Sequence, residues 1–235
     1  MHKNLKVVAL VPARGGSKGI PRKNLVLIDG VSLIERAVSA GLGCEFVDVV
    51  VVSTDDDEMA RAAADAGADV HFRDSAAATD TATADDVVRD FLASSSAARG
   101  TDNMLVVYLQ PTSPLRTASH LTDAFETMIR ADAVRCVSIV KDHHSPFKSL
   151  RLSPSGTLQP LFDEMSVRSN RQALPETFRP NGAIYIFTTK DFRDHAGIPI
   201  AGAVPYLMTQ ETSVDIDSAG DIALADRHLK EKLTE

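Results

Sequence analysis

The feature that most constrains the fold is a short apolar segment followed directly by a glycine-rich basic loop. Residues 7–11, Val-Val-Ala-Leu-Val, are rich in β-branched side chains and are closed by Pro12, which is typical of a buried strand. The loop at 13–24 reads Ala-Arg-Gly-Gly-Ser-Lys-Gly-Ile-Pro-Arg-Lys-Asn, and residues 1–28 contain no Asp or Glu. Because glycines let backbone N–H groups approach an oxyanion, the loop predicts a polyanionic ligand, most simply a nucleoside triphosphate.

The loop matches neither of the two commonest phosphate-binding motifs. A P-loop requires Gly-Lys-Ser/Thr, whereas Lys18 is followed by Gly19 and Ile20. A dinucleotide fingerprint requires a different glycine spacing from that of Gly15, Gly16 and Gly19. The alternative is a surface turn with solvated cations, but the position directly after a strand favours phosphate binding.

Composition narrows the class of protein. A net charge of −7 argues against a general nucleic-acid binder, and no apolar stretch approaches the roughly 20 residues of a membrane span. The N-terminus leads straight into the first strand, so we expect no signal peptide and a cytoplasmic location. Cys44 and Cys136 have no metal-ligand spacing and are expected to be reduced thiols.

Strand and helix signals alternate through the first 140 residues. Strands are predicted at 7–11, 47–52, 69–72, 104–109 and 134–140, and helices at 33–42, 58–66, 84–93 and 118–130. The acidic run at 55–58 is predicted to open a helix. A strand at 183–187 and a helix at 220–232 follow. This order predicts an α/β fold with a doubly wound, mostly parallel, Rossmann-like sheet, whose ligands bind beyond the carboxyl ends of the strands.

We expect a single domain over residues 1–235 that carries one insertion at 141–182. Five prolines lie between 141 and 180, with hairpin-like punctuation at 153–156. A segment of this length is too long to be a simple connecting loop in a compact domain.

Four segments, in order along the chain, resemble the acylneuraminate cytidylyltransferases, the CMP-sialic acid synthetases and their relatives. They are Val11–Asn24, Leu109–Arg116, Phe178–Tyr185 and Ser213–Asp217. The resemblance implies a nucleotidyltransferase that uses CTP, with preference for CTP over UTP resting on the resemblance itself. It also implies that the arm at 141–182 embraces a second subunit and helps to complete its site, so that the protein is a homodimer.

Two cations are expected to be catalytic. Arg14 offers a planar fork for phosphate oxygens and Lys23 a point charge, and the resemblance places both at the triphosphate. The nucleotide-binding residues it implies are Ala13, Arg14, Gly15, Gly16, Ser17, Asn24, Arg73 and Thr83.

Asp215 and Asp217 are the candidate metal ligands. Residues two apart in an extended segment point to the same face, and Mg²⁺ favours one or two carboxylates together with phosphate oxygens. The alternative is structural, because Ser218–Asp221 resembles a capping box at the start of the last helix. The family resemblance favours the Mg²⁺ site.

Seven residues form the expected sugar end: Gln110, Arg116, Lys148, Arg171, Arg179, Asn181 and Tyr185. An α-keto acid carries a carboxylate, which Arg or amide donors bind, while an aromatic wall of Tyr185 or Phe192 suits its side chain. Gln110 could instead cap a strand, and Tyr185 could belong to the core.

The expected reaction is in-line attack of the anomeric hydroxyl of a sialic acid-like nonulosonic acid on the α-phosphate of CTP. CMP-sugar and pyrophosphate are the products. Alternatives are the same chemistry on a legionaminic, pseudaminic or Kdo-type keto acid, or a non-catalytic nucleotide-sugar sensor.

Overall fold

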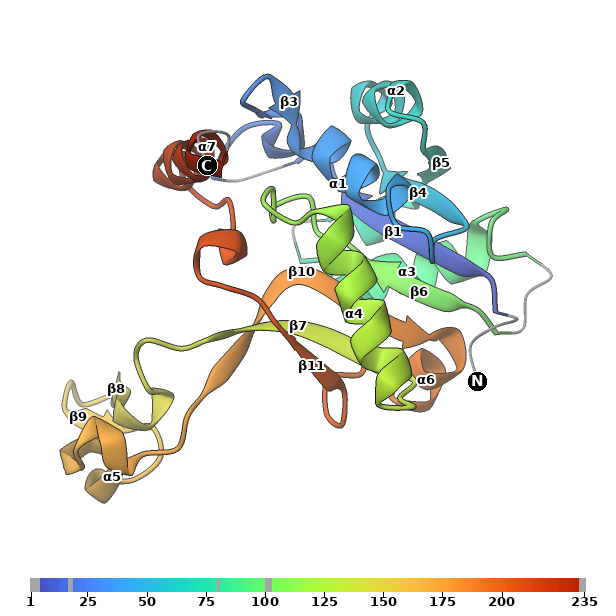
Figure 1. Cartoon of the computed structure of the whole chain (residues 1–235). Helices are drawn as coiled ribbons and strands as arrows, with labels where there is room; N and C mark the ends of the chain where they lie inside the picture. The colour runs from blue at the N-terminus through green and yellow to red at the C-terminus, as the bar shows by residue number, and fades with distance from the viewer. Residues whose placement is uncertain (1–4, 17–18, 80, 100–102, 233–235) are drawn as a thin grey trace.

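A seven-stranded sheet forms the centre of the computed structural model, which describes residues 5–16, 19–79, 81–99 and 103–232 (Figure 1). Its strand order is β11-β7-β10-β6-β1-β4-β5. The strands are β1 (Val7–Ala13), β4 (Val49–Thr54), β5 (Asp69–Phe72), β6 (Leu105–Tyr108), β7 (Arg135–Lys141), β10 (Phe178–Thr188) and β11 (Val204–Leu207). All neighbouring pairs are parallel except the two that involve β10, which runs antiparallel to β6 and β7. The predicted mostly parallel sheet is confirmed.

Helices cover both faces of the sheet, as a doubly wound fold requires. Alternate residues of β1 enter two separate cores: Ala9 and Val11 face one, Val8 and Leu10 the other. The first core contains side chains of α1 (Leu33–Leu42), α2 (Asp57–Asp65) and α4 (Ala118–Arg130), and the second those of α3 (Ala84–Ser94) and α6 (Thr189–Asp194). This alternation follows from the two-residue period of a strand that is buried on both faces.

Polar caps fix where the helices begin. Ser32 and Thr83 form capping boxes at α1 and α3, and Asp56 accepts hydrogen bonds from two amides at the start of α2. The helix start predicted in the acidic run is confirmed.

The first strand extends one residue past Pro12, where the sequence predicted its end. Pro12 is aligned with Ser53 of β4, but β6 pairs with β1 only up to Leu10. Because one side of β1 has no strand neighbour at Pro12, the missing N–H leaves no gap in the ladder.

The segment between β7 and β10 projects away from the sheet (Figure 1). It contains a hairpin of β8 (Leu150–Leu152) and β9 (Leu158–Pro160) and the short helix α5 (Glu164–Arg168). The predicted hairpin at 153–156 is confirmed.

Several elements were not predicted: β11 and α6 in the main body, and the small β2–β3 hairpin (Leu27–Ile28 and Val31–Ser32). That hairpin forms a third core with α7 (Ala219–Lys232). Single 3-10 turns occur at Lys23–Leu25, Ser75–Ala78, Pro146–Lys148, Arg171–Ala173 and Glu211–Ser213. Within the described ranges, no helix combines the length and apolar character needed to cross a membrane.

Candidate active site

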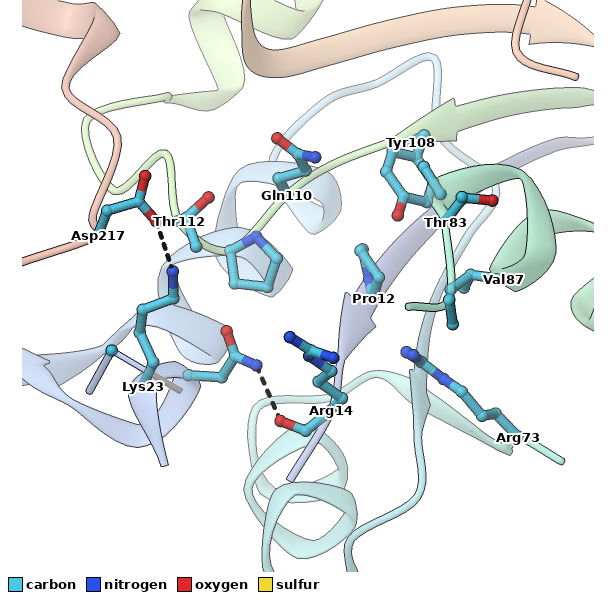
Figure 2. A pocket seen from close by; sticks show the side chains of 15 residues that line it. Pro12, Arg14, Lys23, Arg73, Thr83, Val87, Tyr108, Gln110, Thr112 and Asp217 are labelled. Carbon is cyan, nitrogen blue, oxygen red and sulfur yellow. Dashed lines mark hydrogen bonds and ion pairs between the residues drawn. The ribbon is translucent and has the colours of Figure 1, made fainter. Parts of the chain in front are cut away.

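A cavity of about 390 Å³ opens beyond the carboxyl ends of β1 and β6, the edge at which the sequence predicted a ligand (Figure 2). The loop after β1 forms one side, and the start of α3 and the segment after β6 form the others. Its lining residues are Pro12, Arg14, Gly19, Lys23, Asn24, Arg73, Ala82, Thr83, Ala84, Val87, Tyr108, Gln110, Pro111, Thr112 and Asp217. The fold thus brings together seven residues expected at the site: Arg14, Lys23, Asn24, Arg73, Thr83, Gln110 and Asp217.

Lys23 and Asp217 form an ion pair at one end of the cavity (Figure 2). The Lys23 ammonium donates to the Ile216 carbonyl at 2.7 Å and to Asp217 Oδ1 at 3.0 Å. Arg14 extends into the cavity from the other side of the loop, and its Nη1 donates to the Thr79 carbonyl at 3.0 Å. Two cations from one loop therefore converge on the same space.

Arg73 supplies a third, buried cation. Its guanidinium donates to the carbonyls of Ser53 and Ala77, while its Nε has no hydrogen-bond partner among the described residues. Burial lowers the pKa of Arg73. A buried guanidinium that pairs with carbonyls and faces a cavity is well suited to bind an anion.

The glycine-rich loop is held by the acidic start of α2. The Gly15 amide donates to Asp55 Oδ1 at 2.9 Å, and Arg22 Nη2 lies 2.7 and 2.8 Å from the two Asp56 carboxylate oxygens. A Cβ on Gly15 would lie 3.0 Å from Asp56 Oδ2. A side chain at this position would therefore crowd the Asp56 carboxylate, a contact within the protein that the sequence did not predict.

The other loop residues expected to bind nucleotide have different surroundings. Ala13 is fully buried in the core, and Gly15 and Gly16 do not line the cavity. Asn24 donates to the Arg14 carbonyl at 3.3 Å and so braces the loop. Ser17 lies outside the described residues, as does Lys18.

The segment that carries Asp215 and Asp217 is anchored beside the cavity. The Ile216 amide donates to the Thr112 carbonyl at 2.9 Å, and the Thr112 hydroxyl hydrogen-bonds to the Asp215 carboxylate. Burial raises the pKa of Asp215, and the neighbouring Asp217 charge raises it further. A carboxylate whose charge is opposed by burial and by a neighbouring carboxylate fits a divalent cation.

The capping role at α7 falls to Asp221. Its Oδ2 accepts hydrogen bonds from the Ser218 amide at 2.7 Å and the Asp217 amide at 3.1 Å. The Asp217 carboxylate itself is turned toward Lys23. Helix capping therefore does not account for the Asp217 side chain. No cluster of three or more His, Cys, Asp or Glu suited to a metal occurs among the described residues, so any ion here needs ligand oxygens as well.

A β-bulge in β10 shapes the wall beside Gln110. The register between β10 and β7 shifts between Pro180 and Tyr185, and Gly182 within it has φ +80°. A Cβ on Gly182 would lie 2.3 Å from Gln110 Oε1. The bulge therefore leaves space for the Gln110 side chain, which lines the cavity.

Asn181 and Arg116 are buried and tie this wall together. Asn181 accepts from Ser138 Oγ at 2.6 Å and donates to Ser213 Oγ at 2.8 Å. Arg116 donates to the carbonyls of Gln110 and Ala183 at 2.9 and 3.0 Å, and burial lowers its pKa to about 9. Neither residue lines the cavity, so both hold the wall in position and do not face a ligand themselves.

The two aromatic candidates differ in their surroundings. Tyr185 packs edge to face on Tyr108, with ring centroids 6.3 Å apart, and burial raises its pKa. Phe192 is 3% exposed and stacks on Phe187 in the core next to α3. The expected aromatic wall of Phe192 is therefore absent from the cavity of its own chain.

Three residues that were expected to bind the sugar instead form hydrogen bonds within or near the arm. Lys148 donates to the Val167 and Ser169 carbonyls, Arg171 to the His143 carbonyl, and Arg179 to Asp142 Oδ1 at 3.0 Å. None of the three lines the cavity.

Sequence reasoning missed Pro12, Val87, Tyr108 and Thr112, which all line the cavity. Thr112 lies inside a segment that resembles the family, and Tyr108 is the last residue but one of the strand predicted at 104–109, near the ligand-binding edge. A tyrosine at that position, with an apolar ring and a polar hydroxyl, could have indicated a ligand contact.

Comparison with known proteins identifies the family. The family described as "Cytidylyltransferase" matches residues 8–163. This chain belongs to it. An N-acylneuraminate cytidylyltransferase of Escherichia coli O18:K1:H7 is 30% identical over 94% of this chain and 51% of its own length. One from Oncorhynchus mykiss is 31% identical over 95% of the chain and 50% of its length. This cytidylyltransferase family member therefore spans about half the length of these relatives, and the expected family is confirmed.

Other relatives match along their whole length. The post-translational flagellin modification protein B of Campylobacter coli is 26% identical over 97% of this chain and 96% of its own. Among solved structures, a CMP:2-keto-3-deoxy-manno-octonic acid synthetase complexed with CTP has a TM-score of 0.69 at 16% identity, covering 97% of this chain and 99% of its own. A 4-diphosphocytidyl-2C-methyl-D-erythritol synthase from Anaerococcus prevotii has a TM-score of 0.63 at 10% identity, covering 96% and 99%. These two likenesses establish the fold.

Proposed function

We propose that this cytidylyltransferase family member transfers CMP from CTP to a sialic acid-like nonulosonic acid and releases pyrophosphate. The observation that carries the proposal is one cavity lined by three cations, Arg14, Lys23 and Arg73, in a chain of this family. Three cations around one site suit a triphosphate, whose charge must be neutralised for the transfer. The names of the 30–31% identical relatives support the acylneuraminate as acceptor.

Positioning and electrostatics supply the catalysis in this scheme. The anomeric hydroxyl attacks the α-phosphorus, the bond from that phosphorus to the bridging oxygen breaks, and pyrophosphate leaves in line. Arg14 and Lys23 stabilise the charge that develops on the phosphates. The hydroxyl proton is released to solvent in this scheme, and no histidine lines the cavity among the described residues.

Asp215 and Asp217 would hold Mg²⁺, which as a Lewis acid makes the α-phosphate more electrophilic. The Lys23 ammonium neutralises the Asp217 carboxylate in the ion pair that they form. On binding, Lys23 can turn from Asp217 to a phosphate oxygen without leaving either charge unpaired.

The acceptor would bind beside Gln110, whose amide suits the acyl and hydroxyl groups of the sugar. Apolar side chains of the arm are exposed, among them Leu152 at 72% and Met165 at 80%. We propose that this arm packs on a second copy of the chain. Lys148, Arg171 and Arg179 would then serve the partner's site, as the family resemblance implies, and the protein would act as a homodimer.

The cytoplasm is the proposed location. Cys44 and Cys136 are buried and unpaired with each other, which suits a reducing compartment.

Pyrophosphate release tests the proposal. The protein is incubated with CTP, Mg²⁺ and, separately, N-acetylneuraminic, legionaminic, pseudaminic and Kdo acids. Turnover with one acid establishes the chemistry and names the acceptor. Binding of CTP without turnover on any of them would instead favour the nucleotide-sugar sensor.

A further inference from the structure

Tyr108 is fixed at the carboxyl end of β6, between β1 and β10. It is 3% exposed, and its register partners are Leu10 and Tyr185. Its ring lies in the core on the α3 face and meets the Tyr185 ring at an interplanar angle of 70°. The orientation of the phenol is therefore set by packing.

The Tyr108 hydroxyl makes no hydrogen bond to any described residue, and it points into the cavity (Figure 2). A phenylalanine would fill the same core space, so packing does not require the hydroxyl, which is open to the cavity. Burial also raises the pKa of Tyr108, so the group stays protonated and can both donate and accept. The hydroxyl is thus available to a ligand in the cavity.

The walls near Tyr108 differ from those at the ion pair. Pro12 and Val87 lie on the Tyr108 side of the cavity, and the Arg73 guanidinium lies on that side as well (Figure 2). Lys23 and Asp217 lie at the opposite end of the cavity (Figure 2). The apolar side chains on the Tyr108 side suit a pyrimidine ring and a ribose, whereas Lys23 at the other end suits a phosphate.

We propose that the Tyr108 hydroxyl hydrogen-bonds to the nucleoside part of CTP and so contributes to nucleotide selection. This inference rests on the proposed function, since it takes CTP as the occupant of the cavity. It assigns a binding role to a side chain that sequence reasoning placed in a strand.

Calorimetric titration of Tyr108→Phe with CTP and with inorganic tripolyphosphate, both with Mg²⁺, tests the assignment. One neutral hydrogen bond corresponds to about a 3- to 10-fold change in Kd. We therefore expect the Kd of Tyr108→Phe for CTP to rise by that factor, and its Kd for tripolyphosphate to equal that of the wild type. The matched control is Tyr206→Phe, whose hydroxyl donates to Asp123 on the surface, away from the cavity. Its CTP affinity should be that of wild type.

Two outcomes would overturn the assignment: an unchanged Kd for CTP, or equal weakening of CTP and tripolyphosphate. A wild-type protein that binds no CTP would overturn the proposed function itself, which is a distinguishable result. Titration with dCTP then locates the contact. If the effect of Tyr108→Phe disappears with dCTP, the 2′-hydroxyl is the partner, and if it persists, the partner is elsewhere on the nucleoside.

Discussion

At the scale of single residues, the site depends on charges that are already paired in the structure. Lys23 binds Asp217, Arg22 binds Asp56, and Arg179 binds Asp142. The local motif made Arg14 and Lys23 predictable, because a cationic loop after a strand falls at the ligand edge of such a sheet. The carboxylates that hold the loop were not predictable as partners, since they lie about 34 to 194 positions away along the chain.

Replacing Asp217 by Asn should lower turnover on the order of 100-fold or more, because it removes a carboxylate from the proposed Mg²⁺ site. The side chain is 77% exposed, so thermal stability should change little. Pyrophosphate release and a melting curve measure the two effects. Asp69→Asn, at the start of β5 and outside the cavity lining, is the matched control. Full activity of Asp217→Asn would remove the metal assignment.

At the scale of elements, boundaries were predictable where polar signals fixed them. The predicted bounds of α1 and α4 are those observed, since Ser32 with Glu35, and Thr117, cap their starts. The strand β11 was missed because it is four residues long and contains Pro205, which weakens a strand signal. Its place at the sheet edge, parallel to β7, is decided by packing and not by local sequence.

Asp56 joins two elements, because one carboxylate caps α2 and also holds Arg22 of the glycine-rich loop. Asp56→Asn keeps a good cap but loses the charge pairing, whereas Asp56→Ala loses both. We expect the KM for CTP to rise several-fold in both variants, and about 1 kcal/mol of stability to be lost in the Ala variant alone. Kinetics and chemical denaturation measure these effects. A wild-type KM in Asp56→Asn would show that the loop keeps its place without the Asp56 charge, since Arg22 also pairs with Glu58.

At the scale of the whole molecule, stability should fall on the acid side through His71. Its ring is buried and hydrogen-bonded to Ser53 and Ser94, and burial lowers its pKa while Asp90 opposes the shift. The unfolded chain takes up a proton near pH 6.5 and the folded one only at lower pH, so stability is present above 6.5 and is lost as the pH falls through that value.

Replacing His71 by Gln removes this proton linkage. The fall in melting temperature between pH 7.5 and 5.5 should therefore be smaller for His71→Gln than for wild type. Thermal melts at both values measure the difference. An equal fall in the two proteins would show that His71 does not contribute to the acid sensitivity.

The arm is the segment that we expect to mediate dimerisation. Local sequence signals located the arm along the chain but could not predict its contacts. If its exposed apolar surface packs on a second chain, Leu152→Ser with Met165→Ser should convert a dimer into monomers. Light scattering after size exclusion gives the mass. Leu207→Ser, a change at another exposed apolar side chain on the β11 edge, should leave the mass unaltered. A wild-type mass in the double variant would contradict the role of the arm.

Phosphorus NMR of the protein with CTP, Mg²⁺ and the accepted sugar acid tests the central claim most directly, because it reports which P–O bond breaks. The account predicts loss of the CTP signals with equal gains of pyrophosphate and of one phosphodiester, the CMP-sugar. Formation of CDP with orthophosphate, or with a phosphorylated sugar, would contradict nucleotidyl transfer.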